Sequence, residues 1–95
     1  MTQQYLLGEL SLILGELQTV ATNEAAVLKV ASLRREAETR PLPALASVAA
    51  RALQLTDDWC WDSLAQGDAA AFDRQAAIFV ELWEFTICAG LVEDR

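Results

Sequence analysis

Two carboxylates three residues apart, Glu81 and Glu84, are the side chains in this sequence best spaced to do chemistry. On a helix this spacing puts both on one face, as in helical metal sites and diphosphohydrolases. Such sites add a second acidic motif, often with histidine. Glu9 and Glu16 are further carboxylates, but nothing in their pattern directs them inward. We therefore predict no metal site and no cofactor, and the role of Glu81 and Glu84 stays open.

Other routes to catalysis lack their usual residues. The chain has 95 residues and no histidine, which removes the Ser-His-Asp arrangement and the commonest general base. The sequence contains no glycine-rich phosphate loop. Two cysteines, Cys60 and Cys88, are too few for a disulfide framework or a four-thiolate zinc site. We therefore predict no catalytic residues and expect a protein that is not an enzyme.

Asp62, Ser63 and Leu64 form a tripeptide that is similar to the attachment site of acyl carrier proteins. The resemblance implies a phosphopantetheine arm on Ser63 in a short acidic helical protein. In that family the tripeptide opens a helix after a loop that contains glycine, nearer the middle of the chain. Here Trp61 precedes it, and it lies inside a predicted helix two-thirds along the chain. We therefore interpret the match as a coincidence.

The charge of the chain excludes whole classes of partner. Seven basic and fourteen acidic residues give a net charge of −7, so nucleic-acid phosphates and anionic lipids are poor partners. The charge is segregated: residues 1–28 carry −3, residues 29–51 carry +3 and residues 52–95 carry −7. Glu81 and Glu84 interrupt the longest apolar stretch, so we predict no transmembrane helix. No basic residues precede the first apolar run, so we predict no signal peptide and a cytoplasmic protein.

The apolar residues, 54% of the chain, recur with helical periodicity, and no alternating run predicts a strand. The pattern predicts helices at about residues 3–21, 24–38, 44–66 and 69–92. Four amphipathic helices with short connections favour an all-α fold, an antiparallel four-helix bundle that occupies the whole chain as one domain. Because a chain this short buries only about two-thirds of its surface, we expect the bundle to dimerise.

Three breaks separate the predicted helices. Asn23 is expected to cap the second helix, although the first two helices merge if this break fails. The prolines in residues 40–43 form the clearest break. Gly67 and Asp68 separate the last two helices. A hairpin about Gly67 brings Arg51 level with Glu84, which predicts an ion pair between them. The same register keeps Cys60 and Cys88 roughly 20 Å apart, so we predict no disulfide.

Some residues do not fit a bundle in which each helix buries a single face. The last helix is apolar over roughly 220°, more than one core face requires. On the first helix, Gly8, Ser11 and Gly15 line up away from the leucine seam, and Tyr5 and Leu12 flank them. Each exposed mid-helix glycine costs roughly 1 kcal/mol, which favours close approach of another backbone. We predict that both surfaces are subunit contacts, with Phe85 contributing from the last helix.

Two more residues complete the candidate site. Trp61 lies about 150° from the centre of its helix's apolar face, so we predict an exposed anchor for a partner. Arg34 falls inside an apolar stripe, so we expect it to pair with a carboxylate or, more simply, to extend its guanidinium to solvent. The candidate binding and interface residues are Tyr5, Gly8, Ser11, Leu12, Gly15, Arg34, Trp61 and Phe85.

The sequence therefore favours a small non-catalytic interaction or regulatory module that acts by self-association, as a homodimer, and by binding a protein partner. The alternative is a helical bundle that binds a small molecule between its helices or at the dimer interface. In that alternative Trp61 or Trp83 would stack on the ligand and Arg34 would anchor an acidic group.

Overall fold

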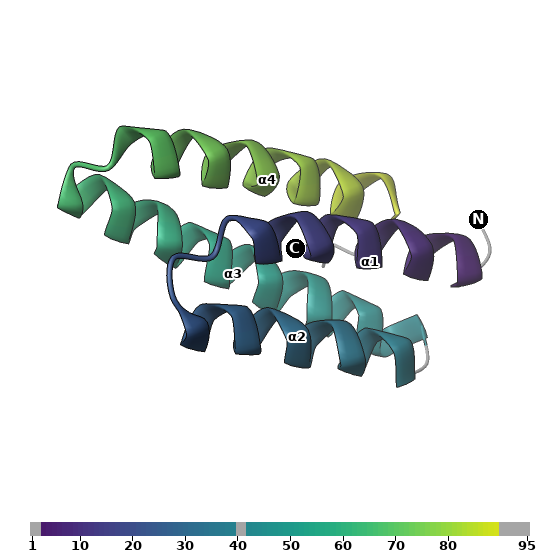
Figure 1. The fold of residues 1–95 in the computed structure, drawn as a ribbon. Helices are drawn as coiled ribbons and strands as arrows, with labels where there is room; N and C mark the ends of the chain where they lie inside the picture. Colours follow the sequence, from purple (N-terminus) through teal and green to yellow (C-terminus); the bar gives the residue numbers. More distant parts are fainter. Residues whose placement is uncertain (1–2, 40–41, 90–95) are drawn as a thin grey trace.

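In the computed structural model, which describes residues 3–39 and 42–89, the chain forms four α-helices. They are α1 (Gln3–Thr19), α2 (Glu24–Thr39), α3 (Leu42–Gln66) and α4 (Ala69–Cys88). No strand occurs in these two ranges. The helices pack as a bundle that measures 40 × 28 × 19 Å, in which α1 lies beside both α2 and α4 (Figure 1). The predicted all-α fold with four helices is confirmed.

Local signals set the ends of the helices. Asn23 caps α2, because its Oδ1 accepts a hydrogen bond from the backbone N–H of Ala26 at 2.8 Å. Asp68 caps α4 by accepting one from the backbone N–H of Ala71 at 3.0 Å. Gly67 has a φ of +74°, in the left-handed region that favours glycine. Both predicted breaks are confirmed, and α1 and α2 are separate helices.

Other helix ends differ from prediction by a few residues. α1 ends at Thr19, two residues early, and α3 begins at Leu42, two residues early. The last helix ends at Cys88, although the pattern predicts it to continue to about residue 92. Residues 40–41, half of the predicted proline break, lie outside the described residues, as do residues 90–95.

One buried apolar cluster draws on all four helices, and the leucine seam of α1 supplies its largest share. Its fully buried members are Leu6, Leu10, Ile13, Leu14, Leu17, Val30, Leu33, Ala37, Leu45, Val48, Ala52 and Leu82. α4 contributes only Leu82 to this set. Ile78 and Phe85 of α4, and Ala89 just after it, are partly buried against the cluster.

The position of α4 in the bundle explains why it contributes so little to the buried cluster. α4 packs against α3 and α1, while α1 and α3 also touch across the bundle. Among the described residues α4 makes no contact with α2. The remaining side of α4 is therefore not covered by any other described helix.

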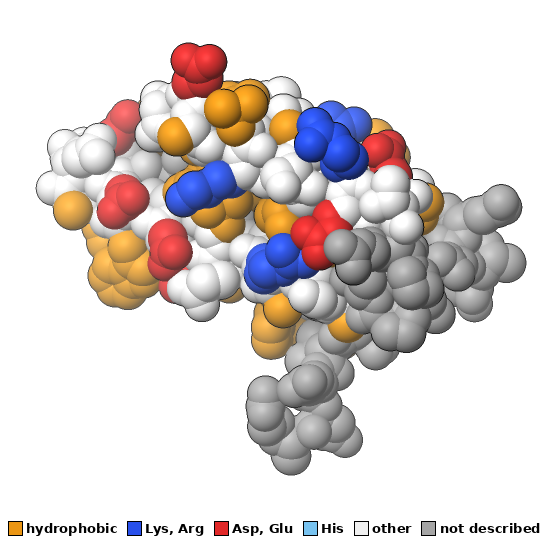
Figure 2. Space-filling model, turned by 90° about the horizontal axis from the view of Figure 1, so that it is seen from below, with side chains coloured by type: hydrophobic (Ala, Val, Ile, Leu, Met, Phe, Trp, Pro, Cys, Tyr) orange, Lys and Arg blue, Asp and Glu red, His pale blue; other side chains and the backbone are white. Residues whose placement is uncertain are grey.

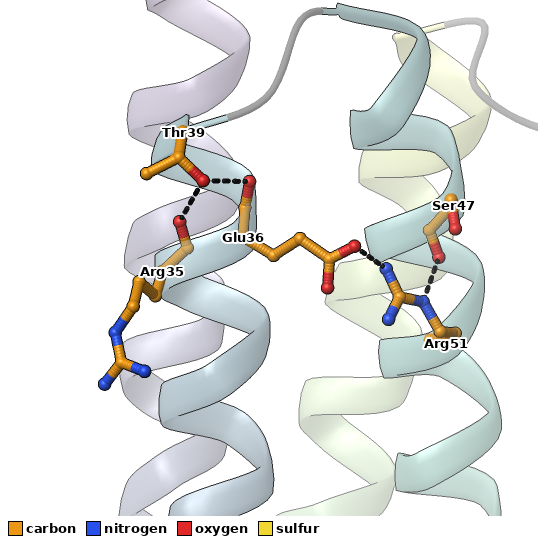
Figure 3. A network of polar contacts seen from close by, with 5 residues as sticks. All are labelled: Arg35, Glu36, Thr39, Ser47 and Arg51. Carbon is orange, nitrogen blue, oxygen red and sulfur yellow. Dashed lines mark hydrogen bonds and ion pairs between the residues drawn. The ribbon is translucent and has the colours of Figure 1, made fainter.

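The predicted ion pair between Arg51 and Glu84 is wrong. The Arg51 guanidinium instead pairs with Glu36 of α2, and its Nε donates to the backbone oxygen of Ser47 at 3.3 Å (Figure 3). One turn further along α2, the Thr39 hydroxyl donates to the backbone oxygen of Arg35 at 3.0 Å. The hairpin register fixes how far along α3 a residue lies, but not which side of the helix it occupies. Arg51 lies on the side of α3 that faces α2.

Candidate functional site

The predicted site residues lie on three separate surfaces of the bundle. The first is a cleft between α1 and α4, the second a shallow hollow between α1 and α2, and the third a groove between α3 and α4. In that order, the residues are Tyr5, Leu12 and Phe85; Gly8, Ser11, Gly15 and Arg34; and Trp61. Trp61 and Arg34 line different surfaces, so these two candidate ligand-binding residues lie apart.

The cleft between α1 and α4 has a volume of about 360 Å³ and an acidic rim. Four carboxylates line it, two from α1 and two from α4: Glu9, Glu16, Glu81 and Glu84. No Lys or Arg is among its lining residues. The sequence paired Glu81 with Glu84, but only the packing of α1 on α4 brings Glu9 and Glu16 to the same place.

The crowding of these carboxylates raises the pKa of Glu81 to about 7. The largest cause is a hydrogen bond with the Glu16 side chain, followed by burial and by the charges of Glu16, Glu9 and Glu84. Two carboxyl groups form a hydrogen bond only when one carries a proton, so this pair shares a proton near neutral pH. Within residues 3–39 and 42–89, no group of three or more Cys, Asp or Glu is arranged to hold a metal ion. The chemistry that the cleft offers is therefore proton uptake between α1 and α4.

In the hollow between α1 and α2, no close contact among the described residues requires glycine at Gly8 or Gly15. A Cβ added at Gly8 would meet nothing within 4 Å, and one at Gly15 would lie 3.9 Å from Nη1 of Arg34, an ordinary contact. Arg34 is half-buried, and its Nη1 donates to Oε1 of Gln18 at 3.1 Å. Its partner is therefore an amide on α1 and not one of the carboxylates considered from the sequence.

The groove between α3 and α4 is a hollow of about 300 Å³ with an almost entirely apolar lining. Trp61 is 64% exposed at its edge, as expected from the sequence. Leu64 is also exposed, beside it. The lining residues are Asp57, Cys60, Trp61, Leu64, Phe72, Ala76, Phe79 and Val80.

The outer face of α4, formed by Val80, Trp83 and Ile87, extends this groove along the helix. Spacings of three and four residues put the three side chains on one face, and each is at least 44% exposed. The opposite pattern holds inside, where Gln75 is 1% and Thr86 2% exposed. α4 therefore turns three large apolar side chains outward and buries two polar ones on the side that also buries Leu82.

Gln75 and Ser63 form a buried polar link that sequence reasoning missed. The Ser63 hydroxyl donates to Oε1 of Gln75 at 2.7 Å, and Nε2 of Gln75 donates to the backbone oxygen of Val20 at 3.3 Å. Ser63 is only 4% exposed, so its hydroxyl is not presented as an attachment site for a prosthetic arm. Residue spacing could have indicated that Gln75 is buried, because Gln75 shares a helix face with Ala71 and Leu82.

Comparison with protein-family models, curated proteins and solved structures finds no significant match. None of the helices described here is long and apolar enough to cross a membrane. Of the three surfaces, the groove together with the outer face of α4 is the most apolar.

Proposed function

We propose that this chain is a non-catalytic interaction module that binds an α-helix of another protein along the α3–α4 groove. One observation carries the proposal: α4 exposes Val80, Trp83 and Ile87 while it buries Gln75 and Thr86. Exposed apolar side chains gathered in one patch mark interaction surfaces, whereas single ones are common on any protein. Covering such a patch with a partner is favourable by about 25 cal/mol per Å² of apolar area.

The shape of the surface favours a helix as the occupant. The backbone groups within a helix are already hydrogen-bonded, so α3 and α4 offer side chains rather than a strand edge for pairing. From Phe72 to Ile87 the apolar surface of α4 extends about 22 Å, the length of about four helical turns. Trp61, on the α3 side, is then the aromatic anchor that such interfaces commonly use.

The charge on this half of the chain favours another protein over a second copy. Residues 52–89 contain seven acidic residues and one basic residue. Two copies that met face to face through this surface would bring like charges together, which disfavours the contact. The homodimer predicted from the sequence, the antiparallel order of the helices and the cytoplasmic location all stay predictions. A native mass spectrum of the purified chain tests the homodimer directly.

An uncharged probe tests the proposal. The probe is an amphipathic peptide of about 18 residues with Leu on one face and Gln on the other, labelled for fluorescence polarisation. Trp61→Ala and Val80→Ser should each weaken binding at least about tenfold, because both remove apolar contact area. Leu28→Ser is the matched control, since Leu28 is 62% exposed on α2, which α4 does not touch.

Circular dichroism of each variant establishes that it has kept its helices before the binding is compared. The proposal fails if the native chain does not bind the peptide at concentrations on the order of 100 µM. It also fails if Leu28→Ser loses as much affinity as the groove variants. A native mass spectrum in which a small molecule occupies the purified chain, and the peptide displaces it, would favour the small-molecule alternative instead.

A further inference from the structure

We infer that the partner helix carries Lys or Arg along both edges of its apolar face; this inference rests on the proposed function. The carboxylates of this chain flank the α3–α4 groove on both of its sides. Asp57 lines the groove itself. Asp58 and Asp62 are exposed on α3, where they also line a hollow that α3 forms with α2, Lys29 included. Asp73 and Glu84 are exposed on α4.

Helical spacing places these acidic residues beside the apolar contacts. On α4, Asp73 and Glu84 lie seven residues before and four residues after Val80, so all three share one side of the helix. On α3, Asp58 lies three residues before Trp61, one turn away on the same side. A helix seated between Trp61 and Val80 therefore has carboxylates along both of its edges.

No Lys or Arg is among the residues that line the groove itself. Arg74 is the one basic residue in residues 52–89, and it points about 100° further round α4 than Asp73, away from the groove. The other described basic residues lie in α2 and the first half of α3. Figure 2 shows the molecule from the α2 side, with Lys and Arg over the middle of this face. Asp57 in the groove and the exposed carboxylates beside it therefore attract a cationic helix.

The size of the effect follows from the exposure of the flanking carboxylates. Each exposed ion pair contributes at most about 1 kcal/mol, but several acting together change affinity by tenfold or more. Because exposed charges are screened, the preference for a cationic helix weakens as salt is added.

Three peptides with the same leucine face and with Lys, Gln or Glu on the other face test this inference. At about 20 mM salt the Lys peptide should bind at least about tenfold more tightly than the Gln peptide, and the Glu peptide more weakly than either. At about 500 mM salt the three affinities should converge. The double variant Asp57→Asn/Asp73→Asn should reduce the preference for the Lys peptide over the Gln peptide at low salt.

A matched double variant, Glu24→Gln/Glu38→Gln, removes the same number of charges from α2 and should keep the preference. If both double variants reduce the preference for the Lys peptide over the Gln peptide equally, net charge sets that preference and not the carboxylates beside the groove. That result would overturn the inference. Equal binding of the Lys and Glu peptides would overturn it as well while leaving the proposed function intact. Failure of the Gln peptide to bind, in contrast, is a failure of the proposed function.

Discussion

At the scale of single residues, the amide of Gln75 connects three parts of the bundle. It accepts a hydrogen bond from Ser63 on α3 and donates one to the backbone oxygen of Val20, just after α1. Each buried polar group in this link has a partner, so the link adds specificity without leaving an unpaired group. A buried group that loses its partner, in contrast, is costly.

Removing this amide should destabilise the fold. Gln75→Ala leaves the Ser63 hydroxyl and the Val20 carbonyl without their partner, and we expect a loss of about 1–3 kcal/mol in the free energy of unfolding. Urea denaturation followed by circular dichroism measures it. Gln66→Ala is the control, because Gln66 is exposed near the end of α3 and should change stability by less than about 0.5 kcal/mol. Equal losses in the two variants would mean that the link contributes nothing.

At the scale of helices, the contact between α1 and α4 contains a titratable pair. Glu81 has an ordinary pKa of 4.5 that its neighbours raise to about 7, so the folded chain holds this proton more tightly than the unfolded chain does. The stabilising contribution of the proton is therefore complete below pH 4.5 and is lost as the pH rises through about 7. Because Glu81 is exposed, the effect is modest.

We expect the melting temperature to be higher at about pH 5 than at about pH 8, by less than about 5 °C. Glu81→Gln should flatten this dependence, because the amide can donate to Glu16 at every pH without titrating. Glu38→Gln is the control for net charge, since Glu38 is exposed on α2, and it should keep the native pH dependence. Melting curves of the three proteins across this range measure the difference. An unchanged slope in Glu81→Gln would show that another group is responsible.

Helical periodicity predicted the four helices and two of their breaks, because the spacing of apolar residues and the caps at Asn23 and Asp68 are local properties. It could not predict how each helix is turned about its axis. An apolar arc as wide as that of α4 fits the core in several rotations, and the observed rotation buries Gln75 rather than Val80. That choice depends on how α1 and α3 pack, which no local pattern contains.

At the scale of the whole molecule, the same limit applies to the candidate site. Trp61 was identifiable because it lies alone on a polar face, whereas the groove around it requires residues from two helices. The sequence showed the segregation of charge, and the fold places the described residues of the basic segment on α2 and the first half of α3. The sequence pattern therefore did not show which surface of the bundle carries which charge.

The two free thiols lie on different surfaces. Cys60 is half-buried and lines the α3–α4 groove, while Cys88 is exposed and lines the cleft between α1 and α4. Burial, together with the charge of Asp57, raises the pKa of the Cys60 thiol, so it reacts slowly near neutral pH.

Because the two thiols lie on different surfaces, their alkylation rates report where a peptide binds. Alkylation of Cys60 by iodoacetamide, followed by mass spectrometry, should slow at least about threefold when the Lys peptide covers the groove. Alkylation of Cys88 in the same sample should keep its rate, and so provides an internal reference. Protection of both thiols would mean that the peptide reorganises the bundle, whereas protection of Cys88 alone would place it in the other cleft. Every molecule thus reports which of its two surfaces is occupied, with no label added.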